Sequence, residues 1–301
     1  MRPELRAAWV MAALALIWGY AWIAAKIALA YAGPFDFAWM RVAVGTVTLA
    51  VIVAASGRRL SPMPWRSVAV VGCVQTAAFL IFNTWALVDS GPGKTSILTF
   101  TMPFWVLLFA WPVLGERLQG IQWLAIALAL CGLTAILEPW EMQTSLLSKL
   151  LAVLAGISWA AGVVFAKRLH NREGTDALQF TFWQMLVGLV PMLLIGTIVP
   201  QKPVEWSAPF VACLLFSGVI ATGLGWYMWL YVLHRLPAGT TSLSSLAVPV
   251  VAAVASAVQL GEHLRPAELA GMTTIAAALA LNAWHIARRH RHDLLTDQPP
   301  D

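Results

Sequence analysis

Aromatic and neutral polar side chains stand out inside the long apolar segments of this 301-residue chain. Trp18 and Trp22 are four residues apart, so they share one face if their segment is helical. Indole rings beside amide and hydroxyl groups can form an amphipathic pocket for an aromatic, planar or zwitterionic small molecule. The candidate substrate-binding residues are Trp18, Trp22, Phe79, Asn83, Ser96, Thr99, Trp159, Gln184, Tyr227, Ser244 and Ser245.

Two basic residues, Lys26 and Arg41, also fall within apolar segments. One interpretation is that either of them contacts a substrate carboxylate. The other is that both long side chains extend to the membrane interface and have no direct role in binding. The sequence leaves both interpretations open.

Acidic residues and histidines, in contrast, lie near segment ends, in loops or in the tail. Buried proton relays and many cation sites use an intramembrane carboxylate or histidine, so we expect no tight proton coupling through a buried acid. No nucleophile, base and acid come together at one depth, and no His, Cys and Asp cluster has metal-ligand spacing. We therefore expect no catalytic residues, no metal and no cofactor. Cys73, Cys131 and Cys213 are interpreted as small buried apolar residues.

The composition identifies the surroundings in which these residues must work. Of all residues 60% are hydrophobic and only 11% are charged, with a mean hydropathy of +0.75. Soluble domains carry about 25% charged residues, so a soluble enzyme and a nucleic-acid binder are excluded. The pattern predicts an all-α membrane protein with ten transmembrane helices. Their approximate ranges are 7–31, 35–56, 66–89, 93–114, 119–138, 146–168, 176–198, 206–234, 238–260 and 266–287.

The positive charges predict the orientation of the chain. With both termini in the cytoplasm, 13 of the 19 Lys and Arg residues lie on the cytoplasmic side and four on the outer side. This asymmetry follows the positive-inside rule. The basic tail, 288–301, is interpreted as a cytoplasmic lipid anchor. The first segment is expected to stay as a membrane span, because it is too long for a signal-peptide core and contains Lys26.

The two halves of the chain resemble each other. Aligning Trp18 with Trp159 also aligns Lys26 with Lys167, and Pro103 corresponds to Pro249. These matches predict two five-helix repeats, 1–145 and 146–287. An odd number of spans inverts the second repeat in the membrane, an arrangement typical of secondary transporters with a site near the midplane. A duplicated membrane enzyme or scaffold is the alternative.

Prolines and glycines indicate where these helices bend. Pro103 and Pro249 are each predicted near the middle of a helix, where proline frees the carbonyl of residue 99 or 245. Those carbonyls and neighbouring hydroxyls are expected to line the cavity. The alternative is a simple kink, with the hydroxyls bonded to their own helix. The predicted hinges are Pro103, Pro249, Gly19 and Gly162, with Gly72 and Gly218 as further bending points.

These motifs resemble the drug/metabolite transporter superfamily, EamA-like family, over nearly the whole chain. The similarity rests on the early Trp and Lys of each half, the Thr-Ser helix with its proline, and the terminal pairs Gly115-Glu116 and Gly261-Glu262. It implies ten helices around a central cavity, alternating access and export of metabolites. The Trp-rich spans look most like the aromatic amino-acid exporters of that family. Lys94 departs from the symmetry, since Thr240 occupies its place in the second half.

Together these observations predict a multi-pass exporter of neutral and aromatic amino acids in a bacterial inner membrane. It is expected to work as a uniporter or exchanger and as a monomer, with a small-molecule substrate and the lipid bilayer as its partners. A permease for other metabolites or lipophilic cations is the alternative transport function.

Overall fold

All regular secondary structure in the described part of the chain is helical. A computed structural model describes residues 3–57, 63–115, 120–137, 145–236, 238–245 and 247–261, with separate residues between 266 and 284. The first half contains α1 (Pro3–Ala28), α2 (Pro34–Ala55), α3 (Trp65–Val71), η1 (Gly72–Ala78), α4 (Phe79–Asp89), α5 (Pro92–Thr99), α6 (Met102–Leu114) and α7 (Gly120–Leu137). The second contains α8 (Leu146–Glu173), α9 (Ala177–Ile198), α10 (Ala208–Leu215), η2 (Phe216–Leu224), α11 (Gly225–Leu233), α12 (Ala238–Ser244) and α13 (Ala247–Leu260).

Among the described residues, seven helical segments are long and apolar enough to cross a membrane. They are Trp9–Ala28, Pro34–Ala55, Trp65–Asp89, Pro92–Leu114, Leu146–Glu173, Ala177–Ile198 and Ala208–Leu233, and they match the predicted spans one to four and six to eight. Helix α7 covers the predicted fifth span, and α12 with α13 covers the ninth. Much of the predicted tenth span and the basic tail lie outside the described residues.

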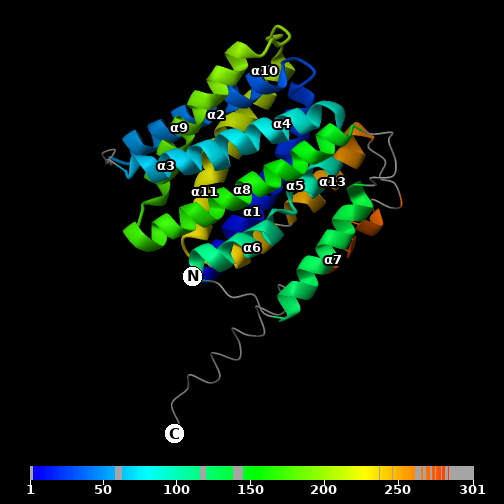
Figure 1. Cartoon of the computed structure of the whole chain (residues 1–301). Coiled ribbons are helices and arrows are strands. Elements are labelled where there is room, and N and C mark those ends of the chain that lie inside the picture. Colours follow the sequence, from blue (N-terminus) through cyan, green and yellow to red (C-terminus); the bar gives the residue numbers. More distant parts are fainter. Residues whose placement is uncertain are drawn as a thin grey trace.

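The halves are interleaved, because helices of one half pack on helices of the other. Helix α2 packs on η2 and α9, while α9 packs on η1, and α1 packs on α13 and α11. In Figure 1, α7 lies at the edge of the bundle, and α1 runs through its middle. This interleaving brings residues distant in sequence to a common centre.

Two spans contain a π-helical segment, η1 in the third and η2 in the eighth. A π-helix has a wider turn than an α-helix and often marks a functional site. Gly72 begins η1 and Gly218 lies inside η2, so both predicted bending points coincide with irregular backbone. Gly19 and Gly162 instead lie inside the uninterrupted helices α1 and α8. A Cβ at these two positions would overlap Val251 or Gln75, so both glycines allow close helix packing.

The prolines end up in a different position from the one predicted. Pro103 and Pro249 were expected in mid-helix, but each lies in the first turn of a second helix, α6 or α13. A proline in the first turn removes no intrahelical hydrogen bond, because the N–H groups of that turn have no intrahelical acceptor. The fourth span therefore breaks between Thr99 and Met102, and the carbonyl of Thr99 faces Gly156 of α8.

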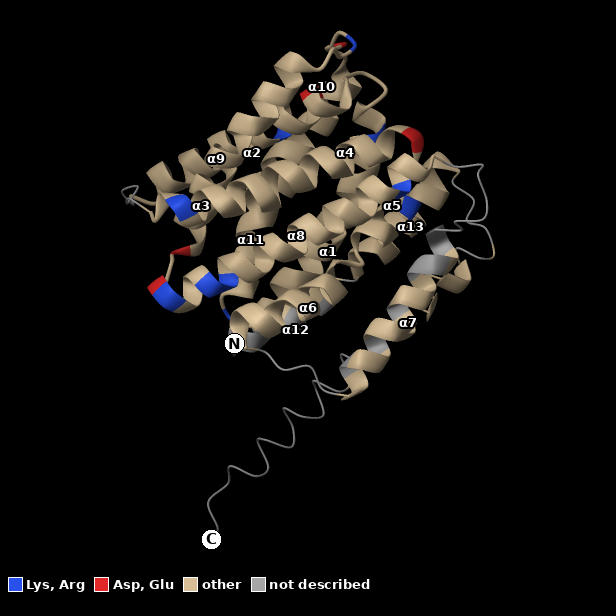
Figure 2. Cartoon of the chain, viewed as in Figure 1, with Lys and Arg blue, Asp and Glu red and all other residues tan. Residues whose placement is uncertain are grey.

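Charged residues gather toward the two ends of the bundle, and the length between them is mostly uncharged (Figure 2). Gly115 and Gly261 follow α6 and α13 with φ of 73° and 63°, in the left-handed region that favours glycine. Their neighbours Glu116 and Glu262 lie outside the described residues. The cysteine prediction was wrong for Cys73 and Cys131, which are exposed. Hydropathy cannot separate a buried position from a lipid-facing one, because both are apolar.

Candidate functional site

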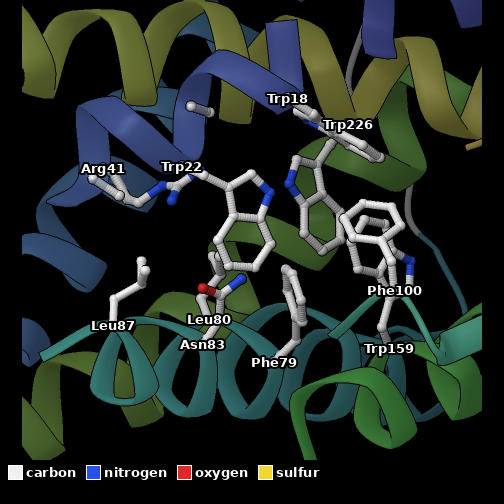
Figure 3. Close-up of a pocket in the computed structure, with 12 residues that line it drawn as sticks. Trp18, Trp22, Arg41, Phe79, Leu80, Asn83, Leu87, Phe100, Trp159 and Trp226 are labelled. Atoms are coloured by element: carbon white, nitrogen blue, oxygen red, sulfur yellow. The ribbon is translucent and has the colours of Figure 1, made fainter. Parts of the chain in front are cut away.

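A central pocket lies between the two halves, with aromatic side chains around most of it (Figure 3). Its free volume is about 40 Å³, which holds only a few water molecules. A larger solute requires the surrounding helices to move apart. The lining residues are Trp18, Ala21, Trp22 and Ala25 of α1, Arg41 of α2, Phe79, Leu80, Asn83 and Leu87 of α4, Phe100, Trp159 of α8 and Trp226 of α11.

The aromatic rings contact one another across the boundary between the halves. The ring centroids of Trp18 and Trp159 are 5.0 Å apart in an edge-to-face arrangement. Phe79 lies 4.5 Å from Trp159, and Trp226 stacks on Trp159 at 5.8 Å with an interplanar angle of 11°. Offset and edge-to-face pairs at these separations are favourable, so the rings form one connected wall.

Trp18 and Trp159 differ in the hydrogen bonding of their indole N–H groups. The Trp18 Nε1 donates to the Ala221 carbonyl oxygen at 2.8 Å. Gly225 makes room for this indole, since a Cβ there would lie 2.6 Å from Trp18 Nε1. The Trp159 Nε1 is buried and has no hydrogen-bond partner in the described part of the chain. An unpaired indole N–H is a ready donor to an incoming acceptor.

Arg41 brings a positive charge to one side of this aromatic wall. Its side chain is 8% exposed, and its Nε donates to Thr222 Oγ1 of η2 at 3.1 Å. In Figure 3 the guanidinium lies beside Trp22, with Asn83 nearby. Thr222 holds one edge of the guanidinium, and a guanidinium has further donors for a carboxylate. Arg41 is therefore buried in the pocket wall.

Lys26 binds backbone carbonyls of another helix. Its Nζ donates to the carbonyl oxygens of Leu87, Val88 and Ser90, at 2.7, 3.1 and 3.0 Å. These carbonyls belong to the end of α4 and the residue after it, where a helix leaves acceptors unsatisfied. The ammonium thus caps a helix, and it does not line the central pocket.

Of the predicted binding residues, Trp18, Trp22, Phe79, Asn83 and Trp159 line the pocket and six do not. The hydroxyls of Ser96 and Ser245 donate to carbonyls three residues earlier in their own segments. This bonding matches the kink interpretation. The hydroxyl of Thr99 donates to the Ala152 carbonyl at 3.2 Å. Gln184 is buried elsewhere, Tyr227 is half-buried and Ser244 is exposed.

The sequence interpretation missed Phe100 and Trp226 as lining residues. Phe100 lies in the break between α5 and α6, and Trp226 lies in the first turn of α11, two residues beyond the end of η2. The side of a helix on which a residue lies cannot be predicted from 3.6 residues per turn when a helix break or a π-helical turn comes before that residue. Trp226 could have been predicted as a lining residue from its position inside a span, next to Gly225.

No acidic side chain is among the pocket-lining residues. The described acids lie at helix ends and in loops. Asp36 in the first turn of α2 accepts from Trp39 Nε1, and Asp176 caps the start of α9. Within the described ranges, no three or more His, Cys, Asp and Glu residues are grouped to hold a metal.

Comparison with known proteins shows which family the chain matches. Residues 5–137 and 146–284 each match the EamA-like transporter family. A "probable terminal-alkyne amino-acid exporter" of Streptantibioticus cattleyicolor is 26% identical over 94% of this chain and 96% of that protein. A "probable amino-acid metabolite efflux pump" of Salmonella typhimurium is 29% identical over 64% of this chain and 67% of that protein.

A solved crystal structure shares the fold. Its TM-score is 0.73 at 19% identity, with 94% of this chain and 99% of the other chain covered. An uncharacterized transporter of Bacillus subtilis is 27% identical over 91% of this chain and 95% of that protein.

Proposed function

Because the chain belongs to the EamA-like transporter family, and is thus a multi-pass integral membrane transporter, we propose that it exports neutral and aromatic amino acids. The observation that carries the proposal is the central pocket, in which one guanidinium lies beside a wall of aromatic rings. An amino acid offers matching groups, a carboxylate beside an apolar or aromatic side chain.

Each part of an amino acid has a partner among the pocket residues. Arg41 binds the carboxylate, because a guanidinium presents paired donors that match two carboxylate oxygens. The side chain packs among Trp22, Phe79 and Phe100. The ammonium is attracted to the faces of the indoles by cation–π interaction, which removes the need for a buried acid.

A permease for lipophilic cations is the competing function, since aromatic rings alone also attract cations. The charge of Arg41 disfavours it, because a cation without a carboxylate meets electrostatic repulsion in a poorly hydrated pocket. The names of relatives from Salmonella and Streptantibioticus also refer to amino acids. An enzymatic function has no support from a family of transporters.

We infer uniport or exchange as the transport mode. Among the described residues, no carboxylate or imidazole lines the pocket, and these are the groups that proton-coupled transporters use to bind the driving proton. The gradient of the metabolite itself is then the driving force. Uphill transport driven by an imposed proton gradient in proteoliposomes would contradict this mode.

The proposal includes ten helices in two inverted repeats, 1–145 and 146–287, with both termini cytoplasmic. The paired segments η1 and η2 and the matching roles of α2 and α9 support this arrangement. One chain encloses the central pocket by itself, which supports a monomer. Alternating access then opens the pocket to each side in turn.

The test is counterflow by the purified protein in proteoliposomes. The substrates are labelled phenylalanine, leucine and phenethylamine, the last of which lacks the carboxylate. Arg41→Met is expected to reduce phenylalanine transport about 10- to 100-fold, because a hydrogen bond to a charged group is lost. Phenethylamine transport should stay unchanged or rise, because the repulsion from the guanidinium is removed. Arg66→Met removes an exposed guanidinium far from the pocket lining and serves as the control.

Two outcomes would refute the proposal. One is wild-type transport of amino acids no faster than leakage from empty liposomes. The other is a preference for phenethylamine over phenylalanine in the wild-type protein, which would favour a cation permease.

A further inference from the structure

Two lysines join the pairs of helices that form the walls of the pocket. Lys26 of α1 binds the carbonyls of Leu87, Val88 and Ser90 at the end of α4. Lys167 of α8 binds the carbonyls of Leu233 and Leu236 at the end of α11, at 2.8 and 3.1 Å. These two lysines correspond in the repeat, and so do their carbonyl partners.

Both helix pairs also contribute residues to the pocket. Helices α1 and α4 supply Trp18 and Phe79, while α8 and α11 supply Trp159 and Trp226. Each lysine therefore bridges two walls of the same chamber. Movement of either pair that widens the chamber at its end must break these hydrogen bonds.

The two bridges lie at opposite ends of the bundle. Trp18 bonds Ala221, and Tyr20 contacts the ring of Phe216 at 5.5 Å, so α1 runs antiparallel to the η2–α11 segment. The end of α11 is therefore near the start of α1, whereas Lys26 is in its last turn. Charged residues mark both ends in Figure 2.

The Lys26 bridge lies on a partition between two cavities. Ala25 and Leu87 line the central pocket, and their neighbours Lys26 and Val88 line a second cavity of about 470 Å³. Lys202 also lines this cavity and donates to the Leu29 and Ala30 carbonyls. Consecutive residues of α1 and of α4 thus line the central pocket and the second cavity.

We infer that Lys26 and Lys167 are paired gating residues that close the outer and inner ends of the pocket. This inference rests on the proposed transport function. Each ammonium stabilises the negative end of a helix dipole and satisfies its last carbonyls. Water replaces those partners when that end opens, so neither gate is a permanent bond. Both bridges are formed in this structure, in agreement with its small central pocket.

The test measures access to the pocket from each side of the membrane. Cys73, Cys131 and Cys213 are replaced by Ala, and Ala21→Cys introduces one thiol in the pocket wall. A membrane-impermeant maleimide is applied to right-side-out and inside-out vesicles. Lys26→Met is expected to raise the labelling rate at least 5-fold from the outer face only. Lys167→Met is expected to do so from the inner face only.

Two controls separate a gate from a purely structural contact. Lys26→Arg keeps donors for the carbonyls and is expected to label at the parental rate. Lys202→Met removes a lysine of the same outer cavity that does not bridge α1 and α4, and it is expected to change nothing. Equal increases from both faces, or no increase with either Met variant, would overturn the inference.

A second measurement removes neither lysine. Ala30→Cys and Val88→Cys, in the same cysteine-free background with Ala21→Cys, are joined by a short thiol cross-linker across the outer cavity before labelling. Labelling from the outer face should then fall while labelling from the inner face persists; unchanged outer labelling would contradict the gate. Neither assay needs a substrate, so failure of amino-acid transport and failure of the gates give different results.

Discussion

At the scale of single residues, the two halves of the chain carry different side chains at matching positions, and this difference places a positive charge on one side of the pocket. Arg41 and Gln184 occupy matching positions in α2 and α9. Arg41 donates to Thr222 and lines the pocket. In the other half, Gln184 Oε1 and Thr76 Oγ1 are buried without partners among the described residues. The backbone arrangement is shared by both halves, but the positive charge is supplied by only one.

Thr222 is a positioning residue for this charge. Thr222→Val keeps the shape of the side chain and removes the acceptor of Arg41 Nε. We expect KM for phenylalanine to rise about 3- to 10-fold, because a hydrogen bond to a charged group is lost while the charge remains. Initial rates in proteoliposomes measure the change. An equal loss of phenethylamine transport would indicate general damage to the pocket.

His234, just beyond the end of α11, confers a pH dependence on stability. Burial first, and then the charges of His170, Lys167 and Arg235, lower its pKa to about 3, against a smaller raising effect of Asp176. An unfolded chain protonates a histidine near pH 6.5. From about pH 6.5 down to 3, the unfolded state therefore binds more protons, and stability falls as the pH falls.

Replacing His234 should weaken the dependence of stability on pH. His234→Phe keeps a ring to stack on His170, whose ring lies 3.6 Å away, and removes the titrating group. The apparent Tm of the wild-type protein in detergent is expected to fall more between pH 7 and pH 4.5 than that of the variant. Parallel Tm profiles of the two proteins would show that His234 does not contribute.

At the scale of helices, glycine contacts determine which elements lie side by side. Helix α9 meets η1 where Gly188 faces Gly72, and α2 meets η2 where Gly45 faces Gly218. Close approach of backbones increases dispersion contacts between helices in lipid, where no hydrophobic effect favours association. These contacts hold the π-helical segments against the straight helices that carry Arg41 and Gln184.

Gly188→Ala tests such a contact. A Cβ at this position would lie 2.6 Å from the Gly72 carbonyl oxygen, and backbone cannot move aside as a flexible side chain can. We expect a loss of about 1–3 kcal/mol, as in overpacked cores, measured as a lower Tm in detergent. Gly120→Ala, with no atom of the described residues within 4 Å of the new Cβ, is the control and should leave Tm unchanged or slightly raised. Equal Tm values for both variants would contradict the packing argument.

At the scale of the whole molecule, orientation decides which way each end of the pocket opens. The proposed topology puts the loop with Lys202 outside and the end of α8 with Arg172 inside. In a background without native cysteines, Lys202→Cys is expected to react with an impermeant maleimide in intact cells. Arg172→Cys should react only after permeabilisation. The reverse pattern would overturn the proposed orientation.

The sequence by itself determined the membrane class, seven of the spans and much of the pocket lining. Hydropathy is a local property, so spans one to four and six to eight could be predicted from composition alone. Trp18, Trp22, Trp159, Phe79 and Asn83 were predicted correctly as lining residues, because aromatic rings and an amide inside apolar segments can form an amphipathic pocket. The family resemblance was confirmed by the match of both halves.

Only the tertiary structure decided which of these side chains meet. It separated Arg41, which lines the pocket, from Lys26, which caps α4. It also brought in Phe100 and Trp226, because a helix break and a π-helical turn change the facing direction of residues beyond them. The physical reason is that hydropathy reports the depth of a residue in the membrane. Its facing direction depends on backbone phase and on helices from the other half of the chain.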